Sequence, residues 1–374
     1  MRKDLSKHNS FDFKNIKVTY LLGAGASYNA VPIWKGQGES MIYVADTILG
    51  YISDNGRLNI EKTKLLHNNP ILINLIESIR NFGKLATEYG SIDIYAKRLY
   101  LLGETEELRN LKHCLSVYFD LWENFVSVKE YLKGNVKYTK IDKRYLSLLS
   151  VLLEKGPDMS IPQIHKNISV ISWNYDLQLE MAYESFMKSK ALLLEAINDG
   201  LNFMGRPESS RRNEIVHLNG FRGIFKNKGE FYDNVQNIVH GTIDTYLQGI
   251  VSDNKDFKNK DYSNCIKYAW EQDSKSLENA LEIMKNTDIL VVIGYSFPSF
   301  NRKIDSQLIN AFQLDNNYMD IILQDPEANQ DIINVLFEKP ENVKVNENPE
   351  QFYIPHEFLF PKDNLDLEEL YDID

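Results

Sequence analysis

The sequence has few cysteines, and this scarcity argues against two common ways of holding a fold together. Of its 374 residues only Cys114 and Cys265 are cysteines, and they lie far apart without a Cys-x-x-Cys spacing. A disulfide scaffold or a structural zinc site needs more cysteines or closely spaced ones. We therefore expect neither, and we expect no metal site.

Long apolar runs and an excess of basic charge are also missing. No stretch of 18 apolar residues exists, and the N-terminal text MRKDLSKHNSFDF lacks the apolar core of a secretion signal. The formal net charge of −11 disfavours binding of nucleic acid over a broad basic surface. These absences predict a cytoplasmic protein with no membrane contact and no direct nucleic-acid binding.

The sequence does contain short apolar runs of strand length. They lie at 18–22, 167–173, 214–220, 288–296 and 319–325. The last two are nearly continuous and end in small or polar residues, as parallel strands buried on both faces do. A helical pattern, KSLENALEIMKNT, precedes the fourth run, and another, RKIDSQLINAFQ, follows it. This alternation predicts the α/β class, with a Rossmann-like open parallel sheet.

Between the first and second strand the pattern is helical, which predicts a large helical insertion. We assign the Rossmann-like domain to 1–35 and 160–345, the insertion to 36–159 and a C-terminal extension to 346–374, whose acidic end DNLDLEELYDID should be solvated. The apolar helices of the insertion, above all 106–132, carry more hydrophobic surface than one small helical layer buries. We therefore expect a homo-oligomer.

The first strand runs directly into a glycine turn, GAGAS, at 23–27. Gly23 and Gly25 allow the tight turn and the close backbone approach that a pyrophosphate needs. The dehydrogenase fingerprint, however, has a third glycine where Tyr28 stands, and an acid that ends a second strand about 20 residues later. In this sequence the corresponding segment, 39–52, has a helical pattern. We expect a dinucleotide loop formed by Gly23, Ala24, Gly25, Ala26 and Ser27, but no hydride-transfer domain.

Three later strands also end in distinctive polar residues. These ends are Trp173-Asn174-Tyr175-Asp176, His217-Leu218-Asn219-Gly220 and Gly294-Tyr295-Ser296. Ligands of open α/β sheets bind at the carboxyl ends of the strands, so these residues are candidates for one site. Each motif alone also has a structural explanation. Asn174 and Asp176 could cap the next helix, His217 could be a structural histidine, and 294–296 could be an ordinary turn.

In this order the motifs resemble the sirtuin-like family, and specifically its NAD-degrading branch in bacterial antiphage defence systems. The matched text is GAGAS with Ala30-Val31-Pro32, Asn174-Tyr175-Asp176, the region 217–220 and Ile293-Gly294-Tyr295-Ser296. Asp305 follows where family members often carry an acid. The resemblance covers about 1–35 and 160–345, and it implies that this Rossmann-like part binds NAD.

The sequence departs from the family in two places. Sirtuin deacylases follow the glycine turn with Ile-Pro-Asp-Phe-Arg and bind zinc through four cysteines, whereas this chain has Val31-Pro32-Ile33-Trp34 and no zinc ligands. Protein deacylation is therefore not expected. The family's Leu-His-Gly is replaced by Leu218-Asn219-Gly220, with His217 two residues before Asn219. Because side chains alternate along a strand, His217 and Asn219 should share one face. His240, in NIVHGTID, is an alternative that keeps the His-Gly pair.

The resemblance implies an NAD glycohydrolase that makes nicotinamide and ADP-ribose, with NAD as substrate and no cofactor. Because nicotinamide leaves NAD as a neutral molecule, the protein needs no general acid; it must hold the ribose and place one water. We assign the placing of water to Asn174 and the polarising of water or ribose hydroxyls to His217. The residues expected to bind NAD are Gly23, Ala24, Gly25, Ala26, Ser27, Asp176, Asn219, Gly294, Tyr295 and Ser296. Asp176 either holds Asn174 and His217 in position or caps the helix that follows it.

The family also implies a biological setting. Its members deplete NAD during phage infection, which aborts the infection, and oligomerisation or co-encoded partners such as HerA-type ATPases keep them off or switch them on. The alternative is a non-catalytic subunit of a defence complex that binds NAD or ADP-ribose in a regulatory or structural role. Asn219 in the usual place of the histidine is its best support.

Overall fold

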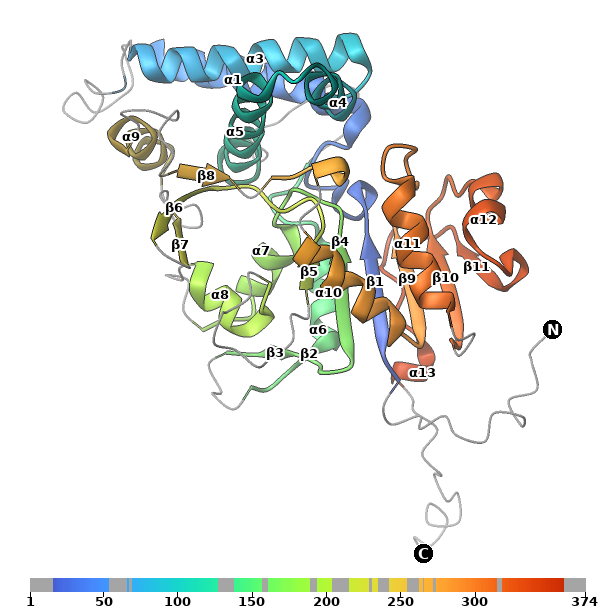
Figure 1. The fold of residues 1–374 in the computed structure, drawn as a ribbon. Helices are drawn as coiled ribbons and strands as arrows, with labels where there is room; N and C mark the ends of the chain where they lie inside the picture. The colour runs from blue at the N-terminus through green and yellow to red at the C-terminus, as the bar shows by residue number, and fades with distance from the viewer. Residues whose placement is uncertain are drawn as a thin grey trace, which may run out of the picture.

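The structure is a computed structural model, drawn in Figure 1. It describes residues 16–53, 66, 69–126, 138–156, 161–188, 194–203, 215–228, 231–234, 242–253, 262–264, 266–271, 274–314 and 318–359. His240, Cys265 and the acidic end of the chain lie outside the described residues.

A six-stranded sheet forms the centre of the molecule, and all its neighbouring strands are parallel. Its strands are β1 (Val18–Leu22), β4 (Ile168–Ser172), β5 (Ile215–His217), β9 (Ile289–Ile293), β10 (Asp320–Gln324) and β11 (Val343–Asn346). Their order is β11-β10-β9-β1-β4-β5. Counted along the chain, this is the 3-2-1-4-5-6 order of the Rossmann fold, whose switch point lies between β1 and β9. The predicted α/β class with a Rossmann-like sheet is confirmed.

The register places the ends of the central strands at one level. Leu22, the last residue of β1, pairs with Ser172 of β4 on one side and with Ile293 of β9 on the other. The residues that follow these strands therefore begin together at the carboxyl edge of the sheet. This edge is where an open α/β sheet binds its ligands.

Helices cover both faces of the sheet. One face packs on α6 (Lys143–Leu152), α7 (Gln178–Glu184) and α8 (Leu194–Leu201), and the other on α10 (Ser274–Lys285), α11 (Arg302–Gln313) and α12 (Gln330–Leu336). Alternation along β1 divides these cores, because Tyr20 and Leu22 face the first group and Leu21 faces the second. The predicted insertion 36–159 includes α6, although α6 packs with the sheet.

A helical layer lies beyond the carboxyl edge of the sheet (Figure 1). It is built from α1 (Trp34–Ser53), α3 (Pro70–Tyr89), α4 (Ile92–Leu102), α5 (Thr105–Leu121), the π-helical turn η4 (Trp122–Val126) and α9 (Ile243–Asp253). The sequence sets these boundaries: Asn69 caps α3 with Pro70 in its first turn, and Ser91 caps α4. The indole N–H of Trp122 donates to the carbonyl of Ala30, which ties the layer to the loop after the glycine turn (2.8 Å).

The physical reason given for a homo-oligomer is not supported by α5. From Leu111 to Leu121, all of its residues except Lys112 are buried inside the chain's own core. This described helix thus leaves no apolar face that calls for a second copy, and residues 127–132 of the predicted segment lie outside the described residues. In the described part of the chain, no helix combines the length and apolar character needed to cross a membrane.

The remaining elements are small. β2 (Leu153–Glu154) and β3 (Gln163–Ile164) form an antiparallel pair, and β6 (Ile224–Lys228), β7 (Phe231–Asn234) and β8 (Tyr262–Asn264) form a three-stranded antiparallel sheet. Short 3-10 turns are η3 (Ala24–Ser27), η5 (Ala269–Glu271) and η6 (Pro340–Asn342), and α13 (His356–Leu359) ends the described chain. Before α13, the C-terminal segment crosses the first face of the sheet, where Phe352 is buried and the carbonyl of Tyr353 accepts from Tyr20.

Candidate functional site

The glycine turn after β1 interlocks with the turn after β9. The backbone N–H groups of Gly23 and Gly25 donate to the carbonyls of Ile293 and Gly294, at 3.0 and 2.9 Å. A Cβ atom on Gly25 would lie 2.8 Å from Cα of Gly294, and one on Gly23 would lie 2.6 Å from the Gly294 carbonyl oxygen. Gly294 itself has a φ of 58°, which favours glycine. Packing of the two turns therefore requires these glycines, independently of any nucleotide.

Arg144, a residue that the sequence reading missed, holds the inner side of the glycine turn. Its guanidinium donates to the carbonyls of Gly25 and Ala26, at 3.2 and 3.0 Å, and pairs with Asp142 at 2.6 Å. Both members of the pair are buried. On the outer side, Ala24 is exposed and Gly25 partly exposed. The turn is thus rigidly backed and open to solvent on one side only.

Ser27, Asn174 and Asp176 form one buried hydrogen-bonded group. The Asn174 side-chain amide donates to Oγ of Ser27 (3.3 Å), and Ser27 Oγ donates to Asp176 (3.0 Å). The Ser27 hydroxyl also lies 3.2 Å from the hydroxyl of Tyr145. The structure thus brings the end of β1 and the end of β4 into direct contact, as the sequence predicted.

Asp176 also explains the start of α7. Its Oδ1 accepts from the backbone N–H of Gln178, the first residue of α7 (3.1 Å), so Asp176 supports the start of the helix from one residue before the N-cap Leu177. Asn174 makes no such bond among the described residues. Burial, and after it the charge of Glu123, raises the pKa of Asp176 to about 7.

His217 is paired with Glu180, which the sequence reading also missed. Nε2 of His217 lies 2.9 Å from Glu180 Oε1, and Nδ1 lies 3.5 Å from the backbone carbonyl of Asn174. Burial alone would lower the pKa of His217, but the Glu180 carboxylate and its hydrogen bond outweigh burial and raise that pKa above its ordinary value. The sequence holds no local signal for this pair, because Glu180 lies on α7 and His217 ends β5, 37 residues later.

Asn219 does not share a strand face with His217, so that prediction is wrong. β5 ends at His217, and the next residues turn away. The Asn219 amide donates to the carbonyl of Trp173 (3.1 Å), whereas its Oδ1 is buried and has no hydrogen-bond partner in the described part of the chain. Asn219 thus ties the end of β5 to the end of β4 and leaves one acceptor unused.

The residues after β9 form a neighbouring group. The Tyr295 hydroxyl donates to the Asp305 carboxyl, with 2.9 and 3.0 Å to its two oxygens, and accepts from Asn301 (3.0 Å). Its ring stacks on Trp173, with centroids 5.9 Å apart. Burial raises the pKa of Asp305 to about 8. Tyr295 and Asp305 thus brace the turn from inside, while Ser296 is exposed at its surface.

A buried charge network connects the site to the helical layer. Arg222 pairs with Asp120 (2.6 Å) and with Glu123, and Glu123 accepts from the side chain of Gln178 at 2.7 Å. Tyr246 of α9 donates to Asp120 at 2.9 Å. Helix α7, which carries Glu180, is thereby anchored to α5 and to the π-helical turn. Residues so far apart in sequence give no local signal that could have revealed this network.

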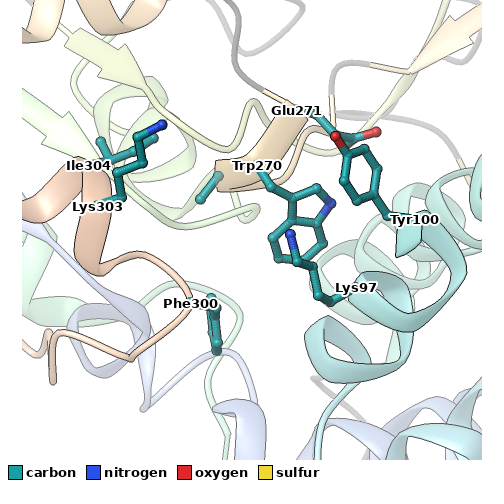
Figure 2. A pocket seen from close by; sticks show the side chains of 8 residues that line it. Lys97, Tyr100, Trp270, Glu271, Phe300, Lys303 and Ile304 are labelled. Carbon is teal, nitrogen blue, oxygen red and sulfur yellow. The ribbon is translucent and has the colours of Figure 1, made fainter. Parts of the chain in front are cut away.

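The structure contains a cleft that none of the predicted site residues lines. It has a volume of about 810 Å³ and is formed by α4, η5 and the start of α11 (Figure 2). Asn174 and His217 are only 6% and 8% exposed. The predicted catalytic side chains are therefore assembled, but they are covered in this form of the molecule.

The described residues contain no group of three or more His, Cys, Asp or Glu side chains placed to hold a metal ion. No family model matches the sequence, and no curated protein matches it.

Proposed function

We propose that the chain is an NAD glycohydrolase that cleaves NAD to nicotinamide and ADP-ribose at the carboxyl edge of the sheet. One observation carries the proposal: residues at the carboxyl ends of β1, β4 and β5 meet in one hydrogen-bonded cluster of Ser27, Asn174, Asp176 and His217, and β1 also borders the Rossmann switch point. Dinucleotides bind Rossmann sheets at this point. The likeness of the motifs to those of sirtuin-like NAD-degrading proteins supports the same assignment.

Asn174 is the residue best suited to place the attacking water. Its amide nitrogen is fixed by Ser27, and no described residue donates to its Oδ1. That oxygen can accept from a water whose lone pair then points at the ribose. Because nicotinamide departs as a neutral molecule, holding the sugar and the water in line contributes most of what the reaction needs.

His217 acts on the ribose side of the reaction. With Nε2 held by Glu180, the ring is fixed in orientation and its positive charge is favoured. The charge of Asp176 also raises the pKa of His217. In this role the imidazole polarises the ribose hydroxyls or the water.

Because Asn174 and His217 are buried, the proposed enzyme should be inactive until a conformational change exposes them. The ribose of NAD can reach Asn174 only if the turns above it move, because Asn174 and His217 are nearly inaccessible. We propose opening by self-association or by a co-encoded partner such as a HerA-type ATPase, in a cytoplasmic antiphage system that ends infection by NAD depletion. These elements rest on the family resemblance.

The same burial favours a second candidate function. A chain that binds NAD or ADP-ribose without cleaving it, as a regulatory or structural subunit of a defence complex, needs no accessible Asn174. Asn219 in the usual place of the histidine points the same way.

Incubation of the purified chain with NAD separates the two candidates. We expect nicotinamide and ADP-ribose to appear in equal amounts by proton NMR, alone or after addition of candidate partners. Binding of NAD without release of nicotinamide under every condition would favour the binding subunit.

A further inference from the structure

The cleft is lined by residues of two helices and by aromatic side chains, of which Trp270 forms what we call the aromatic floor. Lys97 and Tyr100 come from α4, Trp270 from η5, and Lys303 from the start of α11, so the cleft lies between the helical layer and the sheet (Figure 2). Its volume of about 810 Å³ falls within the usual range of small-molecule sites, roughly 300 to 1,000 Å³.

The aromatic floor is fixed in place. Trp270 stacks on Tyr268 with ring centroids 4.8 Å apart and an angle of 2° between the planes, and Tyr100 lies 6.3 Å from Trp270. At the rim, Tyr100 and Phe300 remain 45% and 38% exposed. Tyr268 covers one face of the indole and the Lys97 ammonium lies over the ring, so a planar ring that enters the cleft would stack on Trp270 by displacing Lys97, with Tyr100 and Phe300 as two further aromatic contacts.

The charge of the cleft is positive on a chain of net charge −11. Lys97 lies over Tyr100 and Trp270, with its Nζ 4.8 and 4.7 Å from their ring centroids. In the described residues, no carboxylate comes within 4.0 Å of the ammonium groups of Lys97 or Lys303. Glu271, the acid of the cleft, is already paired with Lys112 at 2.6 Å. Among the described residues, two ammonium groups without a carboxylate partner thus remain for an anionic ligand.

We propose that this cleft binds a nucleoside phosphate, with the base stacked at Trp270 and the phosphates held by Lys97 and Lys303. A simple anion would leave the aromatic floor unused, and an uncharged aromatic molecule would leave the two lysines unused. The ligand would contact α4 and α11 together and so link the helical layer to the sheet. This site is separate from the cluster around Asn174, and its occupation does not depend on NAD cleavage.

Calorimetry with ADP, adenosine and inorganic pyrophosphate tests the proposal on the full chain. Lys97→Ala/Lys303→Ala should weaken ADP at least about tenfold, since it removes both charge-assisted contacts. Trp270→Leu should weaken ADP and adenosine by about tenfold, the order of one base-stacking contact. The control Lys166→Ala/Lys285→Ala removes the same charge from exposed lysines near the amino edge of the sheet and should bind ADP like the wild type.

Thermal unfolding midpoints equal to that of the wild type would show that the variants are folded. Absence of ADP binding by the wild type, or an equal loss in the control, would overturn the proposal. The proposal would also be overturned if the Lys97→Ala/Lys303→Ala variant raised the KM for NAD by the same factor by which it weakened ADP binding. The cleft would then be part of the NAD-binding site. Binding of ADP by a chain that cannot cleave NAD would support this site and contradict the proposed function.

Discussion

Replacement of Glu180 by glutamine isolates the charge that holds His217. The two side chains are 2% and 4% exposed, and their closest atoms are 2.9 Å apart, so solvent screens the pair very little. Removal of one partner from a buried pair costs about 3 to 5 kcal/mol. Because glutamine keeps a hydrogen-bonding oxygen and His217 can lose its proton, we expect the lower end, about 3 kcal/mol in the free energy of unfolding.

The loss should depend on pH in a defined direction. The pKa of His217 is raised in the folded protein, so the pair contributes fully below the unfolded histidine pKa of about 6.5 and loses its contribution as the pH rises through the higher folded value. The difference between wild type and Glu180→Gln should therefore be largest near pH 6 and smaller near pH 9. In the variant, only the hydrogen bond to the Asn174 carbonyl and the charge of Asp176 oppose burial, so the pKa of His217 should fall.

Urea unfolding at the two pH values, with an NMR titration of the imidazole, measures both quantities. The matched control is Glu154→Gln, which breaks a His–Glu contact with His165 at the surface, where the side chains are 58% and 23% exposed. An exposed pair contributes less than about 1 kcal/mol. Equal stability of Glu180→Gln and wild type near pH 6, or an unchanged pKa of His217, would refute this account of the pair.

Two further predictions concern the turns at the carboxyl edge. Gly25→Ala should lower the free energy of unfolding by about 1 to 3 kcal/mol through overpacking against Gly294. Gly50→Ala, in the last turn of α1, adds a Cβ that meets nothing within 4 Å and should raise the free energy of unfolding by up to about 1 kcal/mol. Urea unfolding checks both, and a neutral Gly25→Ala would contradict the packing argument. In the wild type, the raised pKa of Asp305, about 8, favours the protonated native state, and this contribution to stability is lost as the pH rises from about 4 to about 8. Asp305→Asn should therefore show a smaller fall in stability over this range. An unchanged pH dependence would show that Asp305 does not titrate there.

The local pattern of apolar residues was enough to predict the parallel sheet but not every one of its strands. Strands such as Ile289–Ile293 are buried on both faces, so an uninterrupted apolar run identifies them. β11 went unpredicted because Val343–Asn346 is a partly exposed edge strand with polar residues between its valines. Its place comes from pairing with β10, which a linear sequence does not display.

The candidate site also contains residues that the sequence could reveal and residues that it could not. Ser27, Asn174 and His217 could be found because each lies at or shortly after the end of a strand, and parallel strands bring their carboxyl ends together. The end of β5 at His217 could not be found, since Asn219 bonds to the carbonyl of Trp173 from a neighbouring strand end. Arg144 and Arg222 were invisible for a related reason: their partners are set by tertiary packing and not by spacing.

The most direct test of the central claim is the turnover and affinity of Asn174→Ala with NAD. If Asn174 places the water, turnover should fall at least about a hundredfold, while the Kd for NAD and the unfolding midpoint change little. Asn167→Ala, at the amino end of the same strand, is the control and should cleave NAD like the wild type. Undiminished nicotinamide release by Asn174→Ala would contradict the account.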